Sequence, residues 1–213
     1  KNYVYGSVGI PLPGVEIKIG AEDEILVKYG GVMKGYYKNE EETAKVFTED
    51  GYFRTGDAGR IDENGNLYIV DRIKDLMKTS NGKYIAPQTI EIPLQSHPEI
   101  SQAMVIAEGK PYVSAVIVPD FETLIEKYQE FKNYVSLTIE EKKKLLESPF
   151  IKEKFEKIVA DIQKEFASYE KIKKFKLLPE EFTIEKGEIT PTLKIKRRVV
   201  LEKLNSLIEG MYA

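Results

Sequence analysis

Apolar residues in the first third of the chain follow the short, alternating pattern of β-strands. Residues 15–19 and 24–28 are apolar-rich segments of strand length. Residues 59–61 and 67–70 flank the sequence Asp-Glu-Asn-Gly, and an Asn-Gly pair accepts the positive φ of a hairpin turn. These patterns predict a β-rich subdomain over residues 1–72.

One short helix interrupts the predicted strands. Asn39 is a preferred N-cap residue, and it precedes residues 40–47, which begin with three glutamates. Acidic side chains in a first turn are stabilised by the helix dipole, so we expect a helix over these residues.

The middle of the chain predicts a hairpin followed by a helix. The hairpin joins residues 73–79 to residues 83–85 through Ser-Asn-Gly. The helix follows Pro87, and Pro93 removes one backbone donor from it, so we expect a short or kinked helix.

The remaining elements alternate between strands and helices. Apolar runs at residues 103–107 and 113–118 predict a second hairpin with a buried face. Residues 120–170 carry Glu, Lys, Leu and Ile at helical spacing, which predicts two or three amphipathic helices. A short strand at residues 175–178 and a final helix at residues 197–211 complete the prediction.

These elements predict an α+β fold in two parts. We expect a β-rich, barrel-type subdomain over residues 1–72. A small α+β domain with an antiparallel sheet and helices should follow over residues 73–213. No Ser/Gly-rich linker separates them, so the boundary is placed where the β-rich half ends.

Composition excludes several kinds of site and partner. The chain has no cysteine, which excludes disulfides and thiolate catalysis, and its single histidine, His97, argues against a metal cluster. A net charge of −3 gives no basic face for nucleic acid. No apolar run approaches the roughly 20 residues of a membrane span, and no signal segment is seen. We expect a cytoplasmic protein, and a first residue other than Met suits a piece of a longer chain.

Three short motifs carry charges beside tight turns or strand ends. The first, residues 52–57, ends in Thr-Gly-Asp. Gly56 permits a sharp turn, and the Asp57 carboxylate offers two acceptors that suit the hydroxyls of a ribose. An aspartate that stabilises its own turn is the simpler alternative, and the tripeptide alone favours it.

The second motif, residues 71–76, has four charges in six positions. Arg72 offers a planar fork of donors for nucleotide oxygens, and Lys74 lies at the expected pivot between the two parts. A charged, exposed strand edge explains the same residues without any function, and on this motif alone it is the better explanation.

The third motif, residues 187–194, is a loop that contains Pro191 and ends at Lys194. A lysine held on such a loop can present a point charge to a phosphate and stabilise negative charge that builds up there. The alternative is a basic, solvated helix start, because three more cations follow at residues 196–198.

Together and in this order, the motifs resemble those of AMP-forming long-chain fatty acid–CoA ligases, which are acyl-adenylate-forming enzymes. Residues 30–43 are similar to the family stretch that precedes the Thr-Gly-Asp turn. Residues 100–106 and 116–120 are similar to strands of the family's C-terminal lid domain. The resemblance implies that residues 1–72 end the large domain and that residues 73–213 are the lid.

The resemblance also implies a reaction and roles for the motif residues. These enzymes join a fatty acid to AMP with release of pyrophosphate, and after lid rotation they transfer the acyl group to CoA. Asp57 and Arg72 would bind the ribose, and Lys74 would occupy the hinge. Lys194 would be the catalytic lysine of the adenylation step.

The same resemblance implies roles for two residues of the hairpin with the Ser-Asn-Gly turn. Gly82 would line the pantetheine tunnel, since glycine lets a backbone approach a thin ligand closely. Lys78 would reach the phosphates of the adenylate or of CoA. ATP, Mg²⁺ and CoA are the implied cofactors, with the Mg²⁺ and phosphate ligands mainly in a missing N-terminal part, so we expect the fragment alone to be inactive.

Two other functions stay open. The chain would also suit an adenylation domain that loads an acid onto a carrier protein, or a non-catalytic module that docks a partner. The helical segment at residues 120–170 and a lysine at position 74 favour the long-chain branch. Dimerisation through apolar surface left uncovered, and peripheral membrane contact by residues 120–170, are further expectations.

Overall fold

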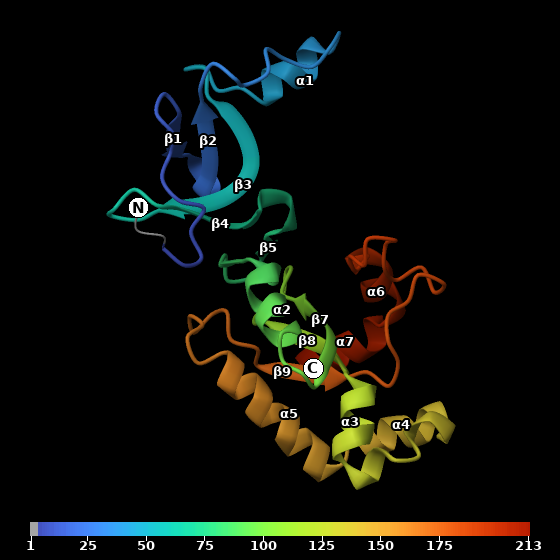
Figure 1. Ribbon diagram of the computed structural model, residues 1–213. Helices are drawn as coiled ribbons and strands as arrows, with labels where there is room; N and C mark the ends of the chain where they lie inside the picture. Colours follow the sequence, from blue (N-terminus) through green and yellow to red (C-terminus); the bar gives the residue numbers. More distant parts are fainter. Residues whose placement is uncertain (1–3) are drawn as a thin grey trace. The chain divides into compact units, whose positions relative to one another are not determined.

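The chain folds into two compact units. The structure is a computed structural model that describes residues 4–213 (Figure 1). The first unit ends at Leu76 and the second runs from Met77 to Ala213. The prediction that the chain begins without a signal segment rests partly on residues 1–3, which lie outside the described residues.

A four-stranded antiparallel sheet with the strand order β1-β2-β3-β4 forms the first unit. Its strands are β1 (Glu16–Ile19), β2 (Glu24–Lys28), β3 (Phe53–Ile61) and β4 (Leu67–Arg72). The predicted Asn-Gly hairpin joins β3 to β4. Asp62 Oδ1 accepts the backbone N–H groups of Asn64 and Asn66 at 2.9 and 2.8 Å, and Gly65 has a φ of +80°.

β3 is long and curved (Figure 1), and its register with β4 shifts between Ala58 and Gly59. A side chain at position 59 would not fit, because a Cβ there would lie 2.5 Å from the carbonyl oxygen of Tyr68. Residue 59 is therefore glycine because the two backbones approach closely. The buried apolar residues of this unit are Ile25, Leu26, Ala58 and Leu67.

The helix α1 (Glu40–Lys45) begins as predicted, with the Asn39 side chain accepting the N–H of Glu42 at 3.1 Å. It ends two residues earlier than expected, because Phe47 leaves the helix to form a bridge with Phe53. The two rings meet edge to face with their centroids 5.7 Å apart.

The first unit closes with a 3₁₀ turn, η2 (Ile73–Asp75), where the sequence predicted the start of a strand. That prediction was wrong at this point. The N–H of Leu76 donates to the carbonyls of Arg72 and Ile73 at 3.1 and 3.2 Å, and these hydrogen bonds close the 3₁₀ turn. The strand that remains, β5 (Met77–Lys78), is only two residues long.

The second unit contains a small hairpin and a three-stranded sheet. β5 pairs with β6 (Tyr84–Ile85) through the predicted Ser-Asn-Gly turn. β7 (Ile100–Ile106) and β8 (Ser114–Pro119) form the predicted antiparallel hairpin. β9 (Lys174–Leu177) lies parallel to β8, so the sheet is mixed. A parallel pair needs a long crossover, and the helical segment between β8 and β9 provides it.

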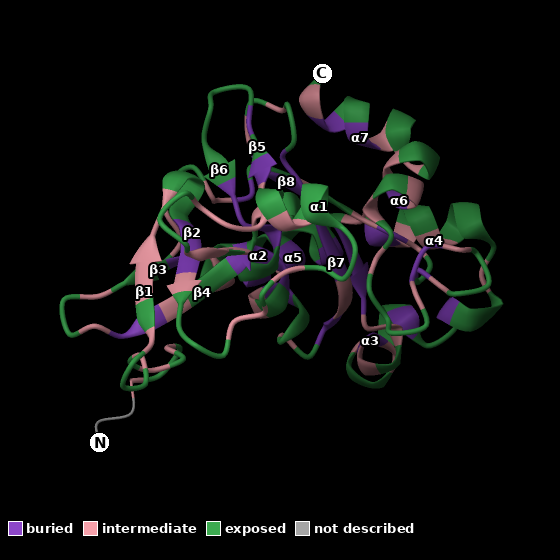
Figure 2. Cartoon of the chain, turned by 90° about the horizontal axis from the view of Figure 1, so that it is seen from above, coloured by how far each residue is buried: buried purple, intermediate pink, exposed green. Residues whose placement is uncertain are grey.

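Helices cover both faces of this sheet, which is why its strands are apolar without alternation. Ala103 and Val105 belong to the core cluster that includes α2, α3 and α5, whereas Met104 and Ile106 belong to the cluster with α6 and α7. Figure 2 shows the buried residues gathered along these central strands. The helices are α2 (Pro87–Gln95), α3 (Phe121–Lys127), α4 (Ile139–Leu146), α5 (Pro149–Ile162), α6 (Arg197–Lys203) and α7 (Asn205–Tyr212).

The α+β fold class and the three helices between residues 120 and 170 confirm the prediction. α2 is short, with Pro93 inside it, as expected. The predicted final helix is divided in two, because Leu204 leaves helical geometry with φ −100° and ψ 15°. Across residues 4–213, no helix combines the length and the apolar character needed to cross a membrane.

Candidate functional site

Asp57 and Arg72 form a cross-strand pair in the first unit. The register of β3 and β4 sets the two residues opposite each other, and Arg72 Nε lies 2.8 Å from Asp57 Oδ1. The Asp57 side chain is 27% exposed and that of Arg72 is 65% exposed, so both polar groups remain accessible to a ligand. The structure therefore brings the two predicted ribose contacts together.

The tight turn predicted before Asp57 is wrong, because these residues lie within β3, where its pairing with β2 shifts register; other groups hold the irregular backbone there. Gly56 has a φ of +71°, and its N–H donates to the buried Glu24 carboxylate at 3.1 Å. The Thr55 hydroxyl donates to the carbonyl of Ile25 at 2.8 Å and accepts the N–H of Asp57 at 3.1 Å. This irregular part of β3 does not depend on the Asp57 carboxylate, which pairs with Arg72 instead.

Lys74, the predicted pivot, is an exposed residue of the 3₁₀ turn η2. It lies two residues before Leu76, where the first unit ends. A short turn of this kind contributes no side chain to either core, which is a suitable place for a change of backbone direction.

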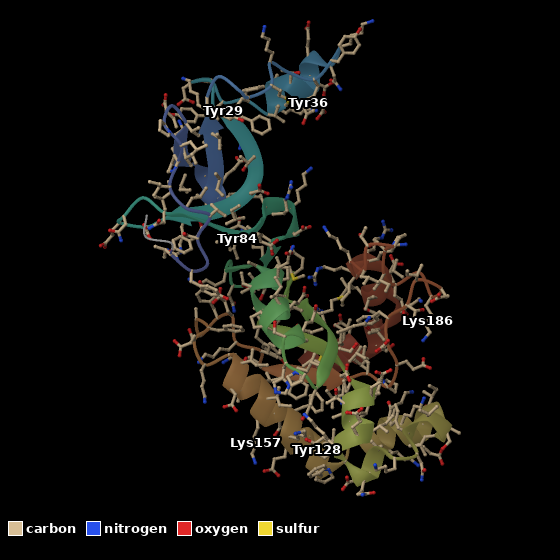
Figure 3. All side chains as sticks on the ribbon, in the orientation of Figure 1. Tyr29, Tyr36, Tyr84, Tyr128, Lys157 and Lys186 are labelled. Atoms are coloured by element: carbon tan, nitrogen blue, oxygen red, sulfur yellow. The ribbon has the colours of Figure 1, made fainter. Side chains whose placement is uncertain are left out.

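Lys78 and Gly82 lie on the β5–β6 hairpin. The Lys78 N–H donates to Glu108 Oε2 at 2.7 Å and its carbonyl accepts the N–H of Gly109 at 2.8 Å, so the hairpin is fixed to the β7–β8 turn. The exposed Lys78 ammonium lies 5.3 Å from the ring centroid of Tyr84, a residue labelled in Figure 3. Gly82 has a φ of +75°, and the space where a Cβ would project is open.

Lys194 lies near the end of a second, smaller hairpin. Thr190 and Lys194 pair through a backbone N–H···O bond of 2.8 Å, and the Lys194 N–H donates to the Thr190 hydroxyl at 3.0 Å. The N–H of Leu193 donates to the Thr190 carbonyl at 2.9 Å, and Leu193 has a φ of +60°. A turn followed by one residue in the left-handed region is a common three-residue hairpin loop.

The Lys194 side chain projects from this hairpin into solvent. Among the described residues, no carboxylate lies within ion-pair distance of its ammonium. Lys194 belongs to the second unit, as do Lys78 and Gly82, but it stands on a different hairpin from them. It is a free cation on a hydrogen-bonded turn.

Sequence reasoning missed one arrangement close to Lys194. Arg197 was attributed to a solvated helix start, which is wrong: its guanidinium Nη2 lies 2.6 Å from both carboxylate oxygens of Glu91. Two signals in the sequence point to such a pair. Glu91 stands on the apolar face of α2, and a cation at the first position of a helix opposes the dipole.

The described part of the chain holds no group of three or more His, Cys, Asp or Glu side chains that could bind a metal ion. Asp57, the carboxylate among the predicted site residues, is already paired with a cation. We therefore assign no Mg²⁺ ligand set to residues 4–213.

A family model described as "AMP-binding enzyme C-terminal domain" matches residues 74–213. The chain is 39% identical over 207 residues to long-chain-fatty-acid–CoA ligase FadD15 of Mycobacterium tuberculosis, covering 97% of this chain and 34% of that protein. It is 36% identical over 197 residues to long-chain-fatty-acid–CoA ligase 5 of Mus musculus, covering 91% of this chain and 28% of that protein.

A solved structure with a similar fold is the A domain of carboxylic acid reductase from Segniliparus rugosus, in complex with AMP and a co-purified carboxylic acid. The TM-score is 0.65 at 29% identity, over 89% of this chain and 28% of that one. The present chain thus spans about a third of the length of the curated relatives that it matches. It belongs to the AMP-binding enzyme C-terminal domain family, and its sequence corresponds to the C-terminal part of fatty acid–CoA ligases.

Proposed function

We propose that this chain is the C-terminal third of an AMP-forming long-chain fatty acid–CoA ligase. The full enzyme activates a fatty acid with ATP to give acyl-AMP and pyrophosphate, and then transfers the acyl group to CoA. The observation that carries this proposal is the Asp57–Arg72 pair, which presents acceptors and donors side by side at an accessible edge of the sheet. Similarity to proteins named long-chain-fatty-acid–CoA ligases supports the substrate class.

The pair suits a ribose. Arg72 uses Nε to hold Asp57 Oδ1, so Asp57 Oδ2 and the two terminal nitrogens of Arg72 are available to a ligand. Oδ2 accepts a hydrogen bond from a ribose hydroxyl, and the guanidinium donates to an oxygen of the same ring. The ion pair places the two side chains next to each other before the nucleotide arrives.

Lys194 acts in the first half-reaction. Its ammonium stabilises the negative charge that builds up on the α-phosphate and on the attacking carboxylate. In this proposal residues 1–72 belong to the large domain and residues 73–213 form a lid. The backbone at Lys74 changes direction so that the lid delivers Lys194 for adenylation and withdraws it afterwards.

The β5–β6 hairpin acts in the second half-reaction. The open backbone at Gly82 lines the path of the pantetheine arm, and the exposed Lys78 ammonium contacts phosphate groups of CoA or of the adenylate. ATP, CoA and Mg²⁺ are the cofactors of this proposal, with the Mg²⁺ and phosphate ligands mainly in the N-terminal part of the full enzyme. A cytoplasmic location, a dimer and membrane contact remain predictions from the sequence.

The test separates the two half-reactions in the full-length ligase. Palmitoyl-CoA formation is measured from palmitate, ATP and CoA, and also from synthetic palmitoyl-AMP and CoA. Lys194→Ala should lower the overall reaction by about a hundredfold or more, while thioester formation from palmitoyl-AMP is kept. Lys196→Ala, a neighbouring exposed lysine, is the control. An overall rate near that of the wild type for Lys194→Ala would refute the assignment.

Transfer to a carrier protein is the second candidate. The structural similarity to the adenylation domain of a carboxylic acid reductase favours it. The acyl acceptor distinguishes the two: a ligase uses free CoA, whereas a loading domain prefers the phosphopantetheine arm of its carrier. If the rate of thioester formation saturates with free CoA at micromolar to millimolar concentration, the full enzyme is a CoA ligase and not a carrier-loading enzyme.

A further inference from the structure

Arg197 occupies an unusual position for a cation. It is the first residue of α6 and lies three residues after Lys194. A positive side chain at a helix N-terminus is disfavoured by the dipole. Its neighbour Arg198 is 92% exposed and pairs along its own helix with Glu202. The Arg197 side chain is 28% exposed, so it is held against the protein for another reason.

That reason is a cluster of four hydrogen bonds. Arg197 Nη2 donates to both oxygens of Glu91 at 2.6 Å, and Nη1 donates to the carbonyl of Val105 at 3.0 Å. Glu91 Oε1 also accepts the N–H of Val105 at 2.7 Å. The cluster joins α2, β7 and the start of α6 at one point. The Glu91 side chain is only 10% exposed, so loss of the guanidinium would remove two short hydrogen bonds and the paired positive charge from a nearly buried carboxylate.

The same cluster fixes the base of the Lys194 hairpin. The N–H of Lys196 donates to the carbonyl of Glu188 at 2.7 Å, which closes the hairpin immediately before Arg197. On the other strand, the Glu188 carboxylate lies 3.0 Å from Lys203 Nζ of α6. Both strands of the hairpin therefore connect to α6, and the bonds of Arg197 tie the first residue of α6 to α2 and β7.

We propose that Glu91 and Arg197 are positioning residues for Lys194 in the adenylation step. Neither residue needs to touch the substrate. They hold the base of a short, hydrogen-bonded hairpin, so that the ammonium at its end reaches the α-phosphate in a defined position when the lid closes. Electrostatic stabilisation of a transition state depends on such preorganisation. The inference rests on the proposed function of Lys194.

The first experiment measures hydrogen exchange in the full-length protein and is independent of activity. Arg197→Met is compared with Arg198→Met, which changes the adjacent, fully solvated arginine. Exchange of the Thr190 and Lys194 amides should become about tenfold faster in Arg197→Met and stay unchanged in Arg198→Met. Exchange within β8 reports any general loss of stability. Unchanged exchange in the hairpin would overturn the anchoring role.

The second experiment measures the two half-reactions with the same variants. Arg197→Met should lower the overall reaction about tenfold while changing thioester formation from palmitoyl-AMP less than twofold. Arg197→Lys and Glu91→Gln keep a side chain of similar size and should give intermediate losses, and they replace Arg197→Met if that variant does not fold. An equal fall in both half-reactions would mean that the pair only stabilises the fold. If Lys194→Ala itself does not affect adenylation, the proposed function fails, whereas the exchange result still decides the anchoring.

Discussion

Asp57 and Arg72 lie opposite each other across β3 and β4, with Arg72 Nε 2.8 Å from Asp57 Oδ1. An exposed ion pair of this kind contributes about 1 kcal/mol or less to the free energy of unfolding. Removing it should therefore change ligand binding far more than it changes stability. The pair can be tested without the risk of unfolding the sheet.

Arg72→Ala should raise the KM for ATP of the full-length enzyme by about tenfold or more, because a hydrogen bond to a charged group contributes roughly 1.5–3 kcal/mol. The melting temperature should change little. Arg60→Ala is the matched control, since Arg60 is an exposed arginine of the same β3–β4 pair and stacks on Tyr68 with 4.0 Å to the ring centroid. Equal effects of the two substitutions on the KM would contradict a specific nucleotide contact by Arg72.

Leu193 adopts a conformation that suits glycine, with a φ of +60°. The left-handed region costs an L-residue roughly 1–2 kcal/mol, and a β-branched residue suffers more from it. Leu193→Gly should therefore leave the free energy of unfolding unchanged or raise it by up to about 1 kcal/mol, whereas Leu193→Val should lower it. Urea denaturation of both variants checks this. A clear loss of stability in the glycine variant would show that the exposed Leu193 side chain contributes more than its backbone costs.

Gly82 and Gly65 both occupy hairpin turns with positive φ, +75° and +80°. An alanine at either position meets the same backbone strain, but only Gly82 lies on the hairpin proposed to line the pantetheine path. Gly82→Ala should raise the KM for CoA several-fold with little change in adenylation, and Gly65→Ala should not. Pyrophosphate release and thioester formation are measured separately. If both variants change the KM for CoA equally, the effect comes from stability and the tunnel assignment is wrong.

Glu99 is a nearly buried carboxylate that contacts two lysines. Lys154 Nζ lies 2.9 Å from Oε2, and Lys127 Nζ lies 3.2 Å from Oε1. The hydroxyl of Tyr128, labelled in Figure 3, donates to Oε1 at 3.1 Å. Burial by itself would raise the pKa of Glu99, but the ion pair with Lys154 and the hydrogen bonds from Lys127 and Tyr128 outweigh it and lower the pKa below its ordinary value.

Because the pKa of Glu99 is lower in the folded state than in the unfolded state, the unfolded state binds the proton more tightly. The Glu99 contribution to stability is therefore complete above the ordinary glutamate pKa and disappears as the pH falls through the lowered folded value. Glu99→Gln should reduce the free energy of unfolding at pH 7 by about 2 kcal/mol, because hydrogen bonds to a charged group are weakened. The difference in the free energy of unfolding between variant and wild type should become smaller below about pH 4. Denaturation curves at several pH values test this, and a difference that does not depend on pH would contradict it.

The sequence by itself determined the local elements. The Asn39 cap of α1, the Asn-Gly turn before β4 and the apolar runs of β7 and β8 follow from groups close together in the chain. Hydrogen bonds over three or four residues and the periodicity of apolar side chains need no knowledge of distant parts. The same local chemistry singled out Gly56, Asp57 and Lys194 as residues with a special backbone or a charge at a position of interest.

The tertiary structure decided which distant groups meet. The pairing of Asp57 with Arg72 depends on the register of β3 and β4, and the parallel direction of β9 depends on the path of three intervening helices. The bonds between Glu91 and Arg197 join residues that are 106 positions apart. No local pattern encodes such a contact, because it exists only once packed helices and strands bring both side chains out of water to the same place. For this reason the position of Lys194 could be predicted from the chain alone, whereas the groups that hold its hairpin could not.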